Sequence, residues 1–184
     1  MRTLAVLLLT LVVVSCTPPP DPRIVGTRTA SAKNTPAVRN VPGGPQLAAG
    51  LKAYDVGDHE RALKDFREAA DKGIADAQYY VGLMYAEGEG TARSYEEAVK
   101  WYAKAAEQNQ PDALYALAKL YVIGGGVDAD PAKAIELYER AENAFPPGEK
   151  RDAAAEQRLA LAAVLNESQN PPAATNGAAP KTGP

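Results

Sequence analysis

The feature that most constrains this chain is a unit of 36 residues that occurs twice, without a gap, between Ala75 and Glu142. A shift of 36 positions superposes identical residues, including Asp76 on Asp112, Ala77 on Ala113, Tyr79 on Tyr115, Tyr85 on Tyr121, Gly88 on Gly124, Gly90 on Gly126, Ala98 on Ala134 and Tyr102 on Tyr138. The same shift backwards matches Tyr102 with Phe66, which predicts a third, variant unit before the other two. A repeat of this length buries its apolar surface only by stacking on its neighbours.

Each unit is expected to be a pair of antiparallel helices. Apolar residues recur at spacings of three and four on both sides of a glycine-containing break, and charged residues occupy the opposite faces. This is the pattern of an amphipathic helical hairpin. The small residues Gly82 and Ala118 lie among larger ones, and they would let the partner helix approach closely. The sequence therefore predicts an all-α fold, an α-solenoid of three hairpins followed by a capping helix.

The second unit contains three segments that resemble the Sel-one-like repeat family, which is related to the tetratricopeptide repeats. They are Ala77–Tyr85 (AQYYVGLMY), Gly88–Gly90 (GEG) and Ala98–Ala106 (AVKWYAKAA). The resemblance extends over about residues 47–145. It implies an α-solenoid that binds other proteins or scaffolds an assembly, and it implies neither catalysis nor a cofactor.

The first 15 residues have the pattern of a signal peptide. Arg2 precedes an apolar run from Leu4 to Val14, which is only about half of the ~20 residues that a membrane-spanning helix needs. Val13–Cys16 (VVSC) resembles a bacterial lipobox, in which Cys16 becomes the acylated first residue. Cys16 is the only cysteine and cannot form an internal disulfide. By resemblance to Gram-negative lipoproteins, Thr17 after the cysteine favours the outer membrane and makes the inner membrane the alternative.

Proline content divides the remaining chain into three parts. Residues 16–45 contain seven prolines and are predicted to be a disordered tether, because they hold too few large apolar residues to offset the entropy of folding. Residues 46–165 are predicted to form the solenoid, and residues 166–184, with four prolines, a disordered tail. A last helix over 149–165 is expected to pack through one stripe of residues, namely Ala155, Leu159, Ala162 and Leu165.

Helix ends and charge pairs are also predictable. Ser94 with Glu97 three residues later reads as a capping box. Asp130 before Pro131 reads as an N-cap, and Pro111 opens the preceding helix in the same way. Spacings of four residues predict ion pairs on the outer faces, Glu60 with Lys64, Glu96 with Lys100 and Glu136 with Arg140.

No constellation of residues points to catalysis or to a metal. His59 is the only histidine and is expected to be a surface turn residue. Gly124–Gly126 lacks the lysine and hydroxyl residue of a phosphate-binding loop, so positive backbone torsions explain it better. Asp128 and Asp130 lack the further ligands of a calcium loop. The formal net charge of −3 argues against nucleic acid, which calls for clustered basic residues.

The sequence therefore predicts a membrane-anchored, periplasm-facing scaffold that binds a protein partner in the cell envelope. Similar repeat lipoproteins serve exopolysaccharide export, so envelope assembly or secretion is the implied setting. A carbohydrate- or peptidoglycan-binding lipoprotein is the alternative, and aromatic residues exposed on the groove would distinguish it. Trp101 and most of the nine tyrosines are expected to be core instead.

The partner is expected to bind along the leading helices of the hairpins. One stripe of each leading helix packs into the solenoid, so the neighbouring stripe should line its concave side. Tyr79 and Tyr115 recur in register, which is expected of structural residues. The other positions of this stripe are therefore the favoured candidates for partner binding. The predicted binding residues are Lys52, Asp55, Asp76, Leu83, Asp112 and Lys119. The alternative is that these residues are simply solvated helix surface and that the loops or the tail bind the partner.

Overall fold

The computed structural model describes residues 43–169. The predicted signal peptide, Cys16, the tether up to residue 42 and the tail from residue 170 lie outside the described residues. The predicted boundaries of the solenoid differ from the helix ends by a few residues. The first described helix begins at Gly44 with Pro45 in its first turn, where proline is tolerated because its missing N–H would have no helical partner. The last helix continues past residue 165 to Gln169.

Residues 43–169 form seven α-helices and no strand, which confirms the predicted all-α class. The helices are α2 (Gly44–Asp55), α3 (His59–Ala70), α4 (Ala75–Glu87), α5 (Tyr95–Glu107), α6 (Pro111–Ile123), α7 (Pro131–Ala144) and α8 (Glu149–Gln169). The short break after α2 and the long breaks after α4 and α6 follow the glycine positions in the sequence.

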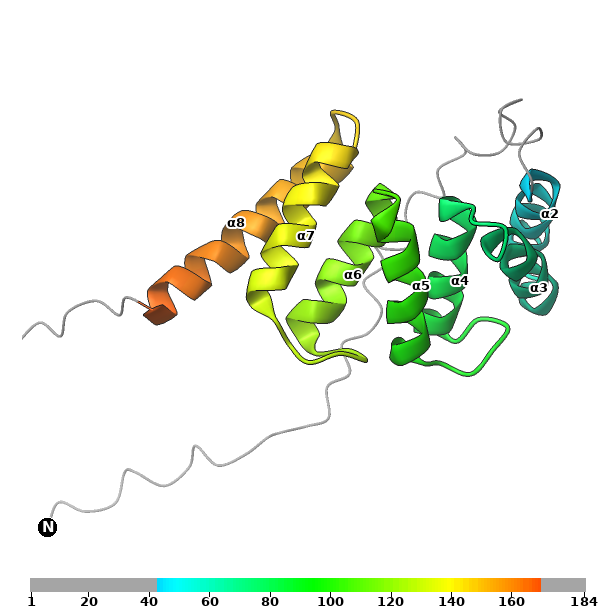
Figure 1. The fold of residues 1–184 in the computed structure, drawn as a ribbon, viewed down its shortest axis with the longest axis horizontal. Helices are drawn as coiled ribbons and strands as arrows, with labels where there is room; N and C mark the ends of the chain where they lie inside the picture. The colour runs from blue at the N-terminus through cyan, green and yellow to red at the C-terminus, as the bar shows by residue number, and fades with distance from the viewer. Residues whose placement is uncertain (1–42, 170–184) are drawn as a thin grey trace, which may run out of the picture. The chain divides into compact units, whose positions relative to one another are not determined.

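The helices pack in chain order, each mainly against the next (Figure 1). The pairs α2/α3, α4/α5 and α6/α7 are the three predicted hairpins, and α8 packs against α7 as the expected capping helix. Contacts between sequence neighbours dominate because no single hairpin can bury both of its faces. The described part of the chain is therefore an α-solenoid.

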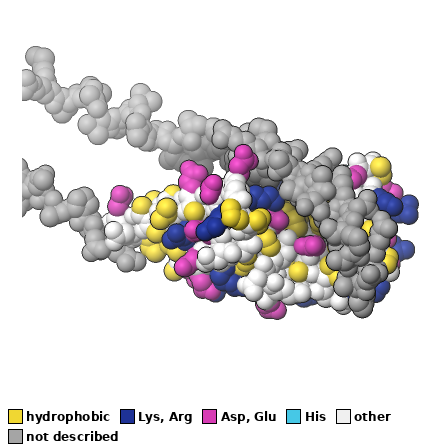
Figure 2. Space-filling view, turned by 90° about the horizontal axis from the view of Figure 1, so that it is seen from above, with side chains coloured by type: hydrophobic (Ala, Val, Ile, Leu, Met, Phe, Trp, Pro, Cys, Tyr) yellow, Lys and Arg dark blue, Asp and Glu magenta, His cyan; other side chains and the backbone are white. Residues whose placement is uncertain are grey.

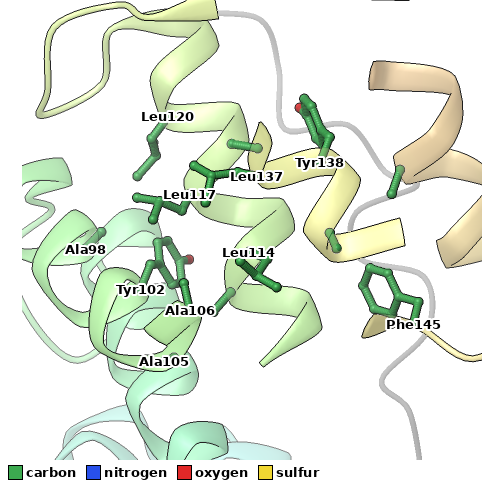
Figure 3. Packing of buried hydrophobic residues seen from close by; sticks show 14 residues of the cluster. Ala98, Tyr102, Ala105, Ala106, Leu114, Leu117, Leu120, Leu137, Tyr138 and Phe145 are labelled. Atoms are coloured by element: carbon green, nitrogen blue, oxygen red, sulfur yellow. The ribbon is translucent and has the colours of Figure 1, made fainter. Parts of the chain in front are cut away.

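The core consists of two clusters that meet at α5. Trp101 belongs to the cluster formed by the first and second hairpins, which also contains Phe66 and Met84. Tyr102, the next residue, belongs to the cluster of the second and third hairpins with Leu117 and Leu137 (Figure 3). Trp101 is 8% exposed and Tyr102 is 3% exposed, so both are core residues, as predicted. Helix α5 thus joins the two halves of the solenoid.

Close helix approach depends on one small residue in each hairpin. A Cβ atom placed on Gly82 would lie 2.6 Å from Cδ1 of Tyr102, and one on Gly50 would lie 2.5 Å from Cδ1 of Phe66. These distances are shorter than van der Waals contact, so α4 and α5 can pack as they do only because position 82 has no side chain. The third hairpin has the buried Ala118 at this position.

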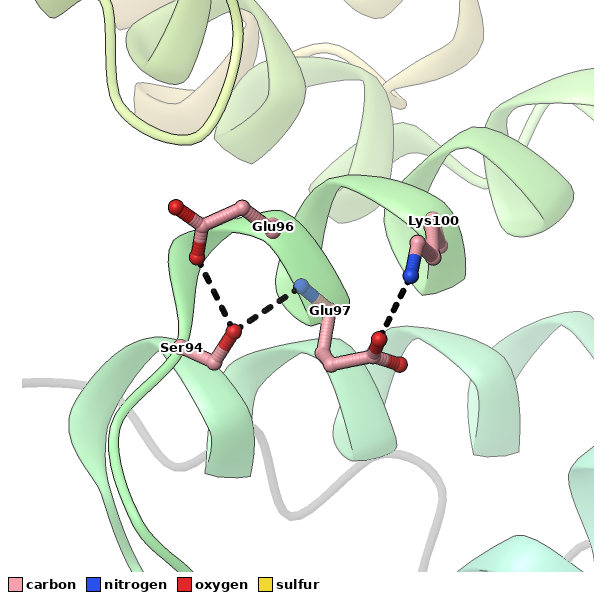
Figure 4. Close-up of polar contacts among 4 residues, drawn as sticks. All are labelled: Ser94, Glu96, Glu97 and Lys100. Atoms are coloured by element: carbon pink, nitrogen blue, oxygen red, sulfur yellow. Dashed lines mark hydrogen bonds and ion pairs between the residues drawn. The ribbon is translucent and has the colours of Figure 1, made fainter.

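The predicted helix caps are present, although the capping box is only half formed. The Ser94 hydroxyl accepts a hydrogen bond from the backbone N–H of Glu97 (3.2 Å) and donates one to the Glu96 carboxylate (Figure 4). The Glu97 carboxylate does not reach back to Ser94 and binds Lys100 instead (2.6 Å). Lys100 therefore pairs three residues back along the helix, not with Glu96 four residues back as predicted. Asp130 caps α7 as predicted.

The predicted stripe of α8 was wrong at Leu159, whereas Ala155, Ala162 and Leu165 are half-buried. Leu159 is 59% exposed, whereas Ala154 is fully buried against α7 and Arg158 binds the Glu142 carboxylate (3.0 Å). The side of α8 that faces α7 therefore includes Ala154 and Arg158. The sequence could not settle this because the second half of α8 is apolar on several faces.

Each long glycine loop joins the two helices of its own hairpin and also contacts the preceding hairpin. Gly88, Gly90, Gly124 and Gly126 all have positive φ, as predicted for this loop. A Cβ on Gly90 would lie 2.5 Å from the His59 carbonyl oxygen, and one on Gly126 would lie 2.6 Å from that of Tyr95. Gly90 thus packs on the first turn of α3, and Gly126 packs on the first turn of α5. The contact repeats with the 36-residue period.

Candidate partner-binding face

The six predicted binding residues lie on the three leading helices, two on each. Lys52 and Asp55 are exposed on α2, Asp76 and Leu83 are half-buried on α4, and on α6 Asp112 is half-buried and Lys119 is exposed. We call this set the leading-helix face. It is defined by Lys52, Asp55, Asp76, Leu83, Asp112 and Lys119.

Three of these residues carry charges that affect the ionisation of Tyr80. Burial raises the pKa of the Tyr80 hydroxyl above its ordinary value, and the negative charges of Asp112, Asp76 and Asp55 raise it further. One carboxylate on each of α2, α4 and α6 thus acts on the same phenol through its charge. The leading-helix face has two residues on each of these three leading helices.

Two of the carboxylates also hold neighbouring elements together. Gln110 Nε2 donates to Asp76 Oδ1 at 3.4 Å, and Lys150 Nζ at the start of α8 donates to Asp112 Oδ1 at 2.5 Å. Asp76 and Asp112 are equivalent in the repeat, so each links its own hairpin to the next element along the chain. Both have a structural role in addition to any role in binding.

Leu83 and Lys119, which differ between the copies, are placed differently. Leu83 packs partly against the core cluster of the second and third hairpins, whereas the Lys119 side chain is exposed. A charge at position 83 would therefore weaken the fold as well as change the surface. Lys52 and Lys119 are the better positions at which to test binding.

The recurring tyrosines have the structural role that their register predicted. The ring of Tyr79 lies 5.9 Å from that of Tyr102, and Tyr115 makes an edge contact with Tyr138 at 5.3 Å. Tyr79 and Tyr115 are half-buried, while Trp101, Tyr102 and Tyr138 are buried. Of the nine tyrosines only Tyr102 and Tyr138 are buried, fewer than predicted, and the other seven are half-buried and pack against the two core clusters.

His59 was expected on the surface and lies instead at the junction of the first two hairpins. It is the first residue of α3, and its ring makes an edge contact with Tyr54 at 5.3 Å. Its Nδ1 lies 3.6 Å from Glu89 Oε2 in the loop of the second hairpin. This contact was not predictable from the repeat pattern, because the two residues are in different units.

Buried polar contacts at the ends of the trailing helices were also missed. Gln78 donates to the Ala70 carbonyl at the end of α3 (3.2 Å) and accepts a hydrogen bond from Gln108 (2.8 Å). At the equivalent place after α5, the Ala106 carbonyl accepts from Arg140 of α7 (2.6 Å). Arg140 is thus an inter-hairpin residue, and its predicted surface pair with Glu136 is not formed. Both carbonyls also accept a hydrogen bond from the backbone N–H of the following turn, Gly73 and Asn109, so each side chain adds a second bond at a helix end.

The described residues contain no group of three or more histidine, cysteine, aspartate or glutamate side chains that could hold a metal ion. Between residues 43 and 169, no helix combines the length and apolarity that crossing a bilayer requires. Over the part of the surface that Figure 2 leaves uncovered, acidic, basic and hydrophobic side chains are interspersed. Such a mixed surface suits a protein partner better than a polyanion.

Three stacked helical hairpins followed by a capping helix define the class of helical-repeat proteins, whose architecture is an α-solenoid. Residues 75–110 and 111–144 match the model of the Sel1 repeat. The chain therefore carries two Sel1 repeats, which coincide with the α4/α5 and α6/α7 hairpins. A comparison with proteins of curated function gave no match.

Two solved structures resemble the chain. A Sel1 repeat protein from Oxalobacter formigenes is 37% identical over 60% of this chain and 33% of that one, with a TM-score of 0.56. A protective antigen present in uropathogenic Escherichia coli strains, which displays an SLR fold, is 26% identical over 72% of this chain and 30% of that one, with a TM-score of 0.56. This chain spans about a third of the length of each of these proteins.

Proposed function

We propose that this chain is a non-catalytic scaffold of the bacterial cell envelope that binds a protein partner through the leading-helix face. Acylated Cys16 anchors it to the outer membrane, and the solenoid faces the periplasm. Its setting is envelope assembly or the secretion of exopolysaccharide. Sel1 repeats mediate interactions between proteins, and the two repeats make up most of the described solenoid.

The observation that carries the binding proposal is that the six residues of the leading-helix face lie in pairs on the three successive leading helices α2, α4 and α6, with none of the six buried. A surface that combines carboxylates with half-buried tyrosines, and with Lys52 and Lys119 nearby on the same helices, offers both apolar area and charge of each sign. Charges at the rim of an interface mainly set the rate and specificity of association. Reversing the two exposed lysines should therefore weaken capture without unfolding the solenoid.

The test uses the full chain in living cells, with a photoreactive amino acid at Val122, which is 39% exposed near the end of α6. The Lys52→Glu, Lys119→Glu double variant is expected to lower the yield of the crosslinked partner about two- to thirtyfold, because each rim charge contributes roughly 0.2–1 kcal/mol. Mass spectrometry of the adduct measures the yield.

The matched control is Lys64→Glu with Lys72→Glu, which makes the same change in net charge at exposed positions of α3 and of the turn after it. It should leave the yield unchanged. Both double variants should keep the wild-type helical melt. If the Lys52/Lys119 variant is folded and captures the partner undiminished, the site lies in the loops or the tail instead.

The anchoring proposal has its own test. Cys16→Ser removes the thiol that would carry the acyl chains, each buried methylene of which contributes about 0.8 kcal/mol to membrane binding. The variant is expected to move from the membrane pellet to the soluble fraction after cell lysis, as measured by immunoblot. A variant that stays with the membranes after a high-salt wash would place the anchor elsewhere.

A further inference from the structure

Helix α8 presents an apolar surface on the side that faces away from α7. Its second half is the sequence Leu159–Leu165 (LALAAVL). Leu159 is 59% exposed and Val164 is 63% exposed, and Ala160 and Ala163 between them are also exposed. Hydrophobic side chains gather at the α8 end of the molecule in Figure 2. We call these four residues, Leu159, Ala160, Ala163 and Val164, the free face of α8.

The order of the helices explains why this face is unpartnered. Helices α2, α4 and α6 are each followed by a trailing helix, α3, α5 and α7, that packs against them. Helix α8 follows α7 as α4 follows α3 and α6 follows α5, so it takes the position of a fourth leading helix. Within residues 43–169 no trailing helix follows it. In a stacked array, an uncovered apolar face at this position is suited to packing against a further helix.

The composition of the free face also suits a helix. Ala160 and Ala163 are small residues flanked by the larger Leu159 and Val164. In the second hairpin, Gly82 has the same function, because the missing side chain lets Tyr102 of α5 pack directly on α4. A helix that carries a large apolar residue could approach α8 closely at Ala160 and Ala163.

Acidic residues lie at both ends of the free face. Glu156 precedes it and Glu167 follows it, and both side chains are exposed. They are eleven residues apart, which corresponds to about 16 Å along the helix at 1.5 Å per residue. An apolar strip with a carboxylate at each end is complementary to an apolar strip with a cation at each end.

We infer that the free face of α8 binds an amphipathic helix of a partner protein, whose apolar stripe is flanked by two lysine or arginine residues about three helical turns apart. The partner helix completes a fourth hairpin in trans. This inference rests on the proposed scaffold function and adds a second binding surface to it.

The same charges argue against a second copy of the chain. An antiparallel pair of α8 helices centred on the free face sets Ala160 against Ala163, and therefore Glu156 against Glu167. A parallel pair in register sets each glutamate against itself. Both arrangements juxtapose like charges, which destabilises an interface. An anionic lipid surface is disfavoured for the same reason.

The chain's own residues 170–184 are also a poor occupant. Prolines at positions 171, 172, 180 and 184 leave no run long enough for three helical turns. Residues 170–184 are therefore not expected to supply the helix that fits this face.

The test uses two synthetic 18-residue peptides that are locked as helices by a hydrocarbon staple. They share one apolar stripe and differ only in the flanking pair, two lysines eleven residues apart or two glutamates. Fluorescence anisotropy measures their binding to the full chain in detergent. The lysine peptide is expected to bind at least about tenfold more tightly than the glutamate peptide. Glu156→Lys with Glu167→Lys should reverse this preference.

The Ala163→Glu variant places a charge in the centre of the free face and should weaken binding of the lysine peptide at least about tenfold. Its control is Val56→Glu, because Val56 is 79% exposed after α2, far along the chain from α8, and the same charge there should change nothing. The helical melt of both variants should match that of the wild type, since both positions are exposed.

Several outcomes would overturn the inference. The first two are equal binding of the two peptides and a folded Ala163→Glu variant that binds the lysine peptide as tightly as the wild type does. The third is a dimer, detected by sedimentation, that the Ala163→Glu substitution dissociates. The fourth is binding of the chain to phosphatidylglycerol vesicles that the same substitution abolishes. The Lys52→Glu, Lys119→Glu variant should bind the lysine peptide normally. If the wild-type chain does not bind the lysine peptide but still forms the crosslink from Val122 that depends on Lys52 and Lys119, this inference alone is rejected. If it binds the peptide but the crosslink does not depend on Lys52 and Lys119, the leading-helix face alone is rejected.

Discussion

Replacing Tyr102 with alanine is expected to lower the free energy of unfolding by about 3–5 kcal/mol, the range for removing a large aromatic side chain from a core. The ring is 3% exposed and fills the space above Gly82, so its loss leaves a cavity between α4 and α5. Such a loss is a large part of the 5–15 kcal/mol that is typical of a domain. Urea unfolding followed by circular dichroism at 222 nm measures it.

The repeat supplies the control for this prediction. Position 66 of the first hairpin is equivalent to position 102 and carries phenylalanine, which packs on Gly50 in the same way. Tyr102→Phe keeps the ring, so it should cost less than about 1 kcal/mol, the net value of a typical hydrogen bond. If Tyr102→Ala were no more destabilising than Tyr102→Phe, the second and third hairpins would not depend on this packing.

The second large effect is expected at Gly126, whose loop rests on the first turn of α5. Gly126→Ala should cost roughly 2–5 kcal/mol. About 1–2 kcal/mol comes from an alanine in the left-handed region, at φ 72°, and about 1–3 kcal/mol from overpacking. The added Cβ would lie 2.5 Å from the backbone nitrogen of Glu96, and a backbone atom in a helix cannot move aside as a flexible side chain can.

Gly124→Ala is the matched control, because Gly124 has nearly the same backbone conformation (φ 68°) in the same loop. A Cβ there would meet Ala129 at 3.5 Å, which is ordinary contact. Only the conformational cost of about 1–2 kcal/mol should remain. The difference between the two variants in urea unfolding isolates the contact between hairpins. An equal decrease in the free energy of unfolding in the two variants would mean that Gly126 does not pack against α5.

Much of the fold could be predicted because the information is local. Proline at the start of α6, Asp130 before α7 and glycine after α4 each act on their own helix end, so the sequence pattern was sufficient. The 36-residue period then predicted which positions are equivalent, and hence that Trp101 and Tyr102 are core. The prediction that Leu159 of α8 is packed was wrong, because a helix that is apolar on several sides contains no local signal for the side it buries.

The binding residues were predictable only in part, for a similar reason. Helix periodicity placed Lys52, Asp76 and Lys119 on leading helices. It could not show that Asp76 accepts a hydrogen bond from Gln110, or that Asp112 binds Lys150 of the capping helix. These partners lie 34 and 38 residues away along the chain, and only the stacking of successive elements brings them together.

The sequence by itself determined the repeat, the hairpins, the helix caps and the positive backbone torsions of the loop glycines, because each depends on spacing within one unit. The tertiary structure alone decided how units meet. It set His59 against Glu89, placed Arg140 on the end of α5 and left the free face of α8 uncovered. Contacts between units depend on the relative rotation of neighbouring helices, and that rotation results from the packing of all their side chains together.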